Sequence, residues 1–136
     1  MIKFVSEKNE LLPKRATSKS AGYDFFAPDD YIVPAHGSCL INTEVSVILP
    51  ENLVLMCFAR SSYGFKYDVV LRNGTGIIDA DFYPNNILIK LRNHSDQDLH
   101  IKKGDRFAQG IILSFYLTDD DNCSIIREGG IGSTGK

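Results

Sequence analysis

Cysteine is scarce in this sequence, and no two cysteines lie close enough along the chain to suggest a metal site. The three are Cys39, Cys57 and Cys123. An odd number argues against a complete set of disulfides. Cys57 lies within an apolar run and Cys39 just before one, so both are expected to be buried thiols. Reduced cysteines are typical of the cytoplasm, so we expect a cytoplasmic protein, or one in the host cytoplasm if the source is viral.

The sequence also lacks a hydrophobic segment that could enter a membrane. The longest strongly apolar run, Leu53 to Ala59, is far shorter than the roughly 20 residues of a transmembrane helix. The first residues, MIKFVSEKNELLPKR, have no apolar core of the kind found in signal peptides. We therefore expect no membrane partner.

Neither charge sign is in large excess. Lysine and arginine number 15 and aspartate and glutamate 17, which gives a formal net charge of −2. Such a balance provides no general attraction to nucleic acid, so we expect no nucleic-acid partner. Any polyanionic ligand must instead be held by a local arrangement of donors.

Several familiar catalytic patterns are missing as well. No histidine has partners at the spacing of zinc ligands, and no serine or cysteine has a base close to it in sequence. The glycine-rich end lacks the Gly-Lys-Ser/Thr of a Walker loop.

What the sequence has is alternation of apolar and polar residues. Val45, Val47 and Leu49 would share one face of a strand, and Ile87, Ile89 and Leu91 a face of another. Only the stretch 61–67 suggests a helix, and a short one. Many short strands without a long helical pattern predict a single all-β domain over residues 1–136, a jelly roll or barrel. The other expected strands are Ile2 to Val5, Tyr31 to Val33, Leu53 to Ala59, Leu99 to Lys102, Phe107 to Tyr116 and Ser124 to Arg127.

A hairpin is expected around Asn73-Gly74, which is a strong turn signal. It would place residues 69–71 against residues 76–78. Exposed backbone groups of such a hairpin could pair with the edge of a nucleobase, and Phe82 could pack against a sugar.

Three stretches have the composition of phosphate-binding segments. They are Arg60-Ser61-Ser62, the segment 104–109 ending in Gln109, and the glycine-rich tail 129–135. Asp79 lies between them in a turn, with Asp81 on the same side. Two such carboxylates could repel, bind metal or divide tasks. Donors that neutralise a polyanion, together with an acid that activates water, are what hydrolysis of a phosphoanhydride requires.

The tail is open to two interpretations. Four of the 11 glycines fall between positions 129 and 135, so the segment is expected to be flexible. It is either a disordered terminus or a mobile lid over residues 127–136, in which glycine amides and the hydroxyls of Ser133 and Thr134 approach phosphate.

The order and spacing of five blocks along nearly the whole chain resemble the trimeric dUTPase family. The blocks are Ala21-Gly22-Tyr23-Asp24-Phe25-Phe26-Ala27, Ala59-Arg60-Ser61-Ser62-Tyr63-Gly64-Phe65-Lys66, 73–82, 104–109 and 129–135. The resemblance implies a distorted jelly roll of the β-clip type and three subunits with shared sites, the tail closing over a neighbour's site. It also implies Mg²⁺-dependent hydrolysis of dUTP to dUMP and pyrophosphate, which keeps uracil out of DNA and supplies dUMP for dTMP synthesis.

The resemblance also implies roles for individual residues. Asp79 matches the base that orients water for attack on the α-phosphorus, and Asp24 matches an acid near the water shell of a metal held mainly by the triphosphate. Asn73 matches the asparagine of the uracil-reading hairpin. The remaining substrate contacts are expected from Arg60, Ser61, Ser62, Gly76, Ile77, Ile78, Phe82, Ile87, Gln109, Arg127, Ile131, Gly132, Ser133 and Thr134.

The sequence departs from the family pattern at the tail. Ile131 stands where the family usually has phenylalanine, and Arg127 is one residue closer to that position than the family arginine. In addition, 83–86 replaces a stretch that commonly has glycine followed by an acid. These departures leave open a trimeric nucleotide-binding or regulatory module with weak catalysis. A dCTP deaminase is a second alternative, because that activity shares the fold superfamily, although the resemblance points away from it.

Overall fold

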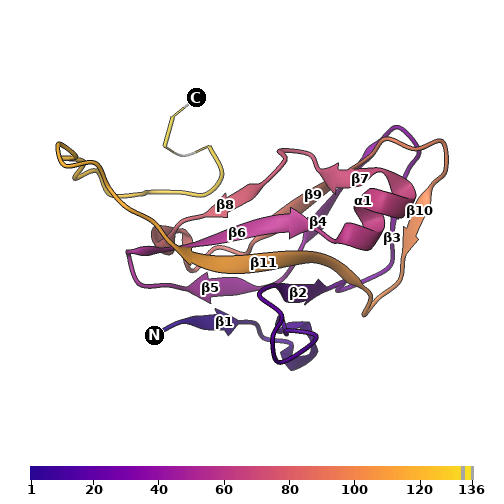
Figure 1. Ribbon diagram of the computed structural model, residues 1–136, viewed down its shortest axis with the longest axis horizontal. Coiled ribbons are helices and arrows are strands. Elements are labelled where there is room, and N and C mark those ends of the chain that lie inside the picture. Colours follow the sequence, from indigo (N-terminus) through magenta and orange to yellow (C-terminus); the bar gives the residue numbers. More distant parts are fainter. Residues whose placement is uncertain (133, 136) are drawn as a thin grey trace.

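Short strands dominate the computed structural model, which describes residues 1–132, 134 and 135 (Figure 1). The expected all-β fold is therefore confirmed. In the described residues the elements are β1 (Lys3–Val5), η1 (Asn9–Leu11), β2 (Tyr23–Phe26), β3 (Tyr31–Val33), β4 (Ser38–Asn42), β5 (Ser46–Ile48), β6 (Leu53–Ala59), α1 (Ser61–Tyr67), β7 (Val69–Leu71), β8 (Gly76–Ile78), η2 (Ala80–Phe82), β9 (Leu88–Asn93), β10 (Leu99–Ile101) and β11 (Arg106–Ser114).

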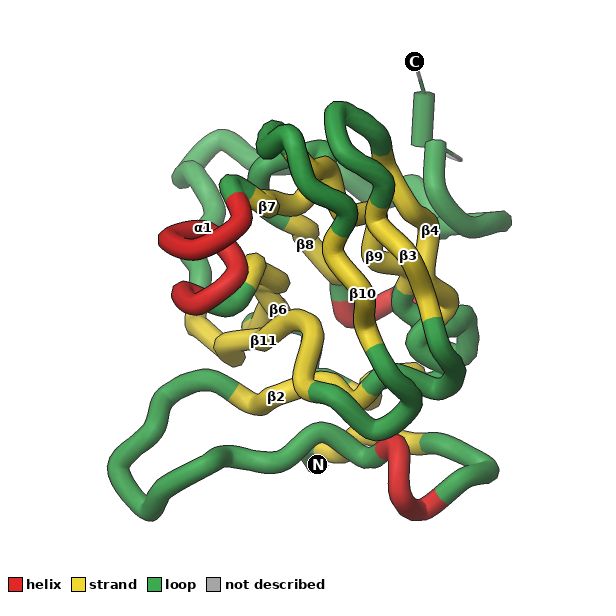
Figure 2. The backbone as a smooth tube through the Cα atoms, turned by 90° about the vertical axis from the view of Figure 1, so that its right-hand side faces the viewer, coloured by secondary structure: helices red, strands yellow, loops and turns green. Residues whose placement is uncertain are grey.

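Two antiparallel sheets enclose the core. The first has the strand order β2-β11-β6-β8 and the second β4-β9-β7, while β1 pairs with β5 and β10 with β3. Figure 2 shows β6 and β11 on one side of the interior and β3, β4 and β10 on the other. Inward-facing residues of both sheets fill the space between them, among them Phe25, Ile41, Leu55, Ile89, Leu91 and Phe107, each at most 1% exposed. Two facing sheets around an apolar interior are the architecture of a jelly roll.

Several local predictions are confirmed, some with shifted bounds, and others are wrong. The strand expected over Phe107 to Tyr116 is β11, which begins one residue earlier and ends two residues earlier. The strands 31–33 and 53–59 and the helix 61–67 have the expected bounds. The strand predicted over Ser124 to Arg127 is wrong, because that stretch is a loop in which Ile125 is 87% and Ile126 83% exposed. A strand needs a hydrogen-bonding neighbour, and apolar composition alone does not supply one. The strands β2 and β4 were not among those expected.

The predicted hairpin is also wrong in its pairing. Asn73-Gly74 does form a turn, with the Gly74 N–H donating to Leu71 O at 2.9 Å and a positive φ of 78° at Gly74. However, β7 pairs with β9 and β8 pairs with β6, so the turn passes the chain from one sheet to the other.

Helix α1 begins directly after β6. Its buried Tyr63 packs against Tyr67 with ring centroids 6.4 Å apart, and the helix ends at Asp68, whose left-handed backbone donates to Tyr63 O. The helix holds Arg60 at the junction with β6, where the guanidinium lies 5.9 Å from the Tyr63 ring. The end of β6 thus presents Arg60 and Ser61 together.

Across residues 1–132, 134 and 135, no helix has the length and apolar character needed to cross a membrane.

Candidate functional site

A pocket forms where β8, η2 and the tail meet. Its lining consists of Asn73, Gly76, Ile77, Ile78, Asp79, Phe82, Leu88, Arg127, Ile131, Gly132 and Thr134. Strand β8 is the end strand of its sheet, so one row of its backbone groups has no partner strand within the described residues. Ile77 projects outward at 63% exposure, while Ile78 and Phe82 are buried. The pocket therefore combines an apolar floor with main-chain hydrogen-bonding groups.

Asp79 is placed by the end of β8. Alternation buries Ile78, and the chain then turns into η2 with Asp79 as an extended residue at φ −76° and ψ 157°. Its side chain is 54% exposed at the pocket wall. An accessible carboxylate on a backbone fixed by the sheet is suited to act as a general base.

Arg127 of the tail bridges two carboxylates at this pocket. Its Nη2 donates to Asp79 Oδ2 and its Nε to Asp81 Oδ1, both at 2.8 Å. The guanidinium also lies 5.8 Å from the Phe82 ring, and the side chain is only 12% exposed. The hydrogen bond to Asp81, with the charges of both carboxylates, raises the pKa of Arg127.

A second pocket lies at the other end of β6. It is lined by Ala16, Ser20, Ala21, Gly22, Asp24, Arg60, Ser61, Gln109 and Ile111. Arg60 Nη1 donates to Arg106 O at 3.0 Å, and Gln109 Nε2 donates to Ala59 O at 3.3 Å. Asp24 is 3.7 Å from Arg106 Nε and is 14% exposed. Cationic, hydroxyl and amide donors gathered in one pocket are suited to phosphate oxygens.

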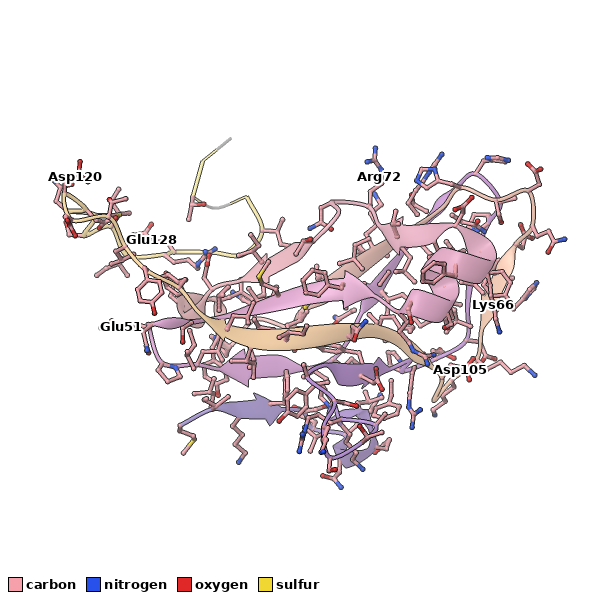
Figure 3. All side chains as sticks on the ribbon, in the orientation of Figure 1. Glu51, Lys66, Arg72, Asp105, Asp120 and Glu128 are labelled. Carbon is pink, nitrogen blue, oxygen red and sulfur yellow. The ribbon has the colours of Figure 1, made fainter. Side chains whose placement is uncertain are left out.

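The two pockets are far apart within one chain. In the β6–β8 ladder Ile78 lies opposite Leu55, whereas Arg60 follows the last residue of β6. Asp79 and Arg60 are thus separated by about six strand residues, or roughly 20 Å. Figure 3 agrees: Asp105, which precedes Arg106, and Glu128, which follows Arg127, lie at opposite ends of the molecule. The two pockets of one chain are therefore too far apart to contact the same phosphate group.

The structure places the expected site residues unevenly. Apart from Ser62, Ile87 and Ser133, all of them line one of the two pockets. Ser62 lines neither, and Ser133 lies outside the described residues. Ile87 is fully buried, and its N–H and C=O are bonded to Val45 and Thr43. The next residue, Leu88, lines the pocket instead.

Sequence reasoning left two site residues out. Asp81 was noted beside Asp79 but given no role, although its spacing of two residues was a usable signal. Leu88 gave no signal, because it alternates with Ile87 and Ile89 and so falls on the strand face that was expected to be polar. Within the described residues, no group of three or more His, Cys, Asp or Glu side chains is arranged to hold a metal ion.

Comparison with known proteins agrees with this geometry. A family model for dUTPase matches residues 8–135, which contain all five sequence blocks. The chain belongs to the dUTPase family. The deoxyuridine 5'-triphosphate nucleotidohydrolase of Arabidopsis thaliana is 40% identical over 139 residues, covering 98% of this chain and 81% of the relative. That of Debaryomyces hansenii is 35% identical, with 98% and 86% covered.

Solved structures support the same assignment. The dUTPase from Streptococcus mutans superposes with a TM-score of 0.78 at 33% identity, covering 87% of this chain and 98% of that one. A Staphylococcus bacteriophage 80alpha dUTPase with dUpNHpp superposes at 0.76 but is 22% identical, so it supports the fold alone. The resemblance to dUTPases is therefore confirmed. The names of these relatives favour nucleotide hydrolysis over dCTP deamination or a binding module with weak catalysis.

Proposed function

We propose that this chain hydrolyses dUTP to dUMP and pyrophosphate, with Asp79 activating the attacking water. Membership in the dUTPase family supports the reaction, and the exposed Asp79 carboxylate at the β8 pocket supports the assignment of Asp79 as the base. Asp79 takes a proton from water as the oxygen attacks the α-phosphorus, and pyrophosphate leaves as the anhydride bond breaks. A general base contributes about 10²–10⁴-fold to such a step.

The β8 pocket is proposed as the nucleoside site. The free edge of β8 offers backbone groups from Gly76 to Ile78 to the edge of uracil, and Asn73 stands at the same wall. Buried Phe82 supplies an apolar surface for deoxyribose. Of the tail, Ile131, Gly132 and Thr134 line the same pocket.

The pocket at Arg60 is proposed as the phosphate site of a neighbouring subunit. Arg60, Ser61 and Gln109 would balance the charge of the triphosphate there. Because Arg60 and Asp79 of one chain are roughly 20 Å apart, a second copy of the chain would supply one half of each site. A head-to-tail contact of this kind, repeated around a closed ring, gives equivalent composite sites, and three copies form the homotrimer that we propose.

In this arrangement Mg²⁺ would bind together with the triphosphate of the substrate. Mg²⁺ keeps several waters and is commonly bound through one or two carboxylates and substrate phosphates. Asp24 is a lone carboxylate among phosphate-type donors, which suits contact through a water. When bound together with the substrate, the ion would neutralise phosphate charge. A phage phi11 dUTPase of S. aureus, 22% identical, is described with a structural Mg(II) ion.

Product analysis tests the proposal. The protein is incubated with deoxynucleoside and ribonucleoside triphosphates, with and without Mg²⁺, and dUMP, pyrophosphate and ammonia are measured. We expect dUMP and pyrophosphate from dUTP, with Mg²⁺ required. Asp79→Asn should lower turnover by about 10²–10⁴-fold while calorimetry still shows nucleotide binding. Ammonia released from dCTP, or tight dUTP binding without product, would overturn the proposed reaction.

A cytoplasmic location is part of the proposal. It is supported by the three free cysteines among the described residues.

A further inference from the structure

A groove opens at the end of the jelly roll where α1 faces β10 and the first residues of β11. Figure 2 looks toward this end, with α1 and β10 on opposite sides of it. The groove has a volume of about 550 Å³, which is in the range of small-molecule sites, and the mouth of a barrel is a common place for such a site. This mouth groove is lined by Phe26, Arg60, Tyr63, Tyr67, Leu99, His100, Gly104, Asp105 and Arg106.

Aromatic rings and arginines share the lining of the mouth groove. The rings of Tyr63 and Tyr67 lie at 78° to each other with centroids 6.4 Å apart, and Phe26 adds a third ring. The Arg60 guanidinium lies 5.9 Å from the centroid of the Tyr63 ring and donates to Arg106 O at 3.0 Å. A flat ring could therefore stack in the groove while an anion that it carries contacts a guanidinium.

The hydroxyl of Tyr63 points to a ligand independently of the shape of the groove. Tyr63 is only 8% exposed, yet its hydroxyl makes no hydrogen bond within the part of the chain that the structure describes. In that part every fully buried side-chain nitrogen or oxygen has a partner, so this hydroxyl reaches open space, and Tyr63 lines the groove. A buried phenol usually has a partner. Burial, together with the charge of Asp105, raises the pKa of Tyr63, so the hydroxyl keeps its proton and can donate to an anion.

The charges in the mouth groove favour an anion. Asp105 is the one acid among the described residues that line it, against Arg60, Arg106 and the imidazole of His100. Arg106 Nε is 3.7 Å from Asp24 Oδ2, which is too long for a hydrogen bond. Donors of this kind are suited to the oxygens of a phosphate group.

We propose that the mouth groove binds a nucleoside monophosphate, with its base on the aromatic rings and its phosphate at Arg60, His100 and the Tyr63 hydroxyl. Stacking accepts any base, so this site does not share the preference for uracil expected of the β8 pocket. Arg60 also lines the proposed phosphate site, so the two ligands compete for one guanidinium. Occupation of the groove therefore weakens dUTP binding, and the reverse holds by the same factor. This coupling rests on the proposed function, whereas binding in the groove does not.

Calorimetry with adenosine 5'-monophosphate (AMP) tests the groove without substrate. Wild type is compared with Tyr63→Phe, His100→Gln and, as a matched control, His94→Gln, which changes an exposed histidine outside the groove. We expect saturable binding with a Kd of about 1 mM or tighter in wild type and His94→Gln. Binding should be roughly tenfold weaker in Tyr63→Phe and weaker by a smaller factor in His100→Gln. Tyr63→Phe should keep its thermal stability, because it removes only a hydroxyl without a partner.

Two results would overturn the site. One is the absence of saturable AMP binding to wild type. The other is an equal Kd in wild type and in both groove variants. Inorganic phosphate is titrated in parallel, and we expect it to bind more weakly than AMP because it has no ring to stack. Phosphate that binds as tightly as AMP would overturn the role of the aromatic rings.

Inhibition kinetics test the coupling through Arg60. AMP is added to dUTP hydrolysis by wild type, His100→Gln and His94→Gln, at several dUTP concentrations. We expect AMP to raise KM for dUTP to a plateau about fivefold above its starting value in wild type and His94→Gln. His100→Gln should keep the uninhibited kcat and need more AMP for the same rise. Equal inhibition of all three proteins would overturn the coupling. If wild type fails to hydrolyse dUTP, the proposed function fails, but calorimetry still decides the groove.

Discussion

Asp79 and Arg60 lie at opposite ends of the same pair of antiparallel strands. Ile78 is opposite Leu55, so Asp79 leaves β8 near the beginning of β6, while Arg60 follows its last residue. At about 3.3 Å per residue this separation is far beyond the reach of two side chains on one phosphate group. The two side chains of one chain therefore cannot contact the same phosphate group, which is why the proposed site takes its carboxylate and its guanidinium from different subunits.

Mixed oligomers should recover activity that neither variant has alone. Asp79→Asn removes the proposed base and Arg60→Ala the proposed phosphate contact. A site built from the intact Asp79 of one subunit and the intact Arg60 of another would be complete. After the two proteins are mixed, denatured and refolded together, roughly a quarter of the sites should be intact on random association. Pyrophosphate release measures the recovery.

The control for mixed oligomers is a variant carrying both substitutions in one chain. When this double variant is refolded with an equal amount of wild type, the loss of activity shows how far inactive subunits alone dilute the wild-type sites. Mixed single variants that stay as inactive as each parent would show that each site lies within one chain.

Gly22 is predicted to hold the Gln109 side chain in the orientation in which its amide donates to Ala59 O. A Cβ at position 22 would collide with the Gln109 side-chain oxygen, so alanine forces that amide to turn away from Ala59 O. We expect Gly22→Ala to raise KM for dUTP by about tenfold, since a hydrogen bond to a charged group contributes about 1.5–3 kcal/mol. Thermal unfolding should change little, because the displaced group is the end of a flexible side chain.

Gly64→Ala provides the comparison for Gly22. A Cβ at Gly64 would meet only Val69 O at 3.9 Å, and alanine is a better helix former than glycine. KM should stay near the wild-type value. An equal rise in KM in both variants would show that the Gly22 effect does not come from Gln109.

Local signals explain which elements could be predicted from the sequence. The strand 53–59 is a continuous apolar run, and the helix 61–67 follows it with tyrosines four residues apart that pack together. The turn at Asn73-Gly74 could also be predicted. Its strand pairing could not, because the partners of β7 and β8, around Leu91 and Cys57, lie elsewhere in the chain and compete with the local hairpin.

In the candidate site, too, individual residues could be predicted from local sequence patterns, whereas contacts between distant segments could not. Arg60, Asp79 and Gln109 could be named from five sequence blocks, and each lines a pocket. The pairing of Arg127 with Asp79 and Asp81 could not, because it depends on how residues 115–126 return the chain to β8. Ile87 was assigned one residue out of place, since the alternation that buries it also exposes Leu88 to the pocket.

An aromatic side chain at position 131 should tighten nucleotide binding. Ile131 lines the β8 pocket and is 75% exposed, so a ring there could stack on uracil. Stacking contributes about 1–3 kcal/mol, which predicts a fall of roughly fivefold or more in Kd for a non-hydrolysable dUTP analogue in Ile131→Phe. Calorimetry measures it. Ile125→Phe, in an exposed part of the tail, should leave Kd unchanged, and an unchanged Kd in Ile131→Phe would contradict stacking.

Thiol chemistry should distinguish the three cysteines by burial. Cys57 is 1% exposed, and its burial raises the pKa of the thiol from 9.0 to about 12, while Cys39 is half-buried and Cys123 exposed. The thiolate reacts with disulfide reagents, so at pH 8 Cys123 should be modified first, Cys39 more slowly and Cys57 only after unfolding.

The same burial links Cys57 to stability at high pH. Because the folded pKa is raised, the unfolded chain loses this proton first, so the contribution of Cys57 to stability is full below pH 9.0 and declines as pH rises toward about 12. Wild type should therefore lose more stability between pH 8 and 11 than Cys57→Ala, by about 2 kcal/mol in denaturant titrations. Parallel losses in the two proteins, or rapid labelling of Cys57 in the folded protein at pH 8, would contradict the burial of its side chain in the core.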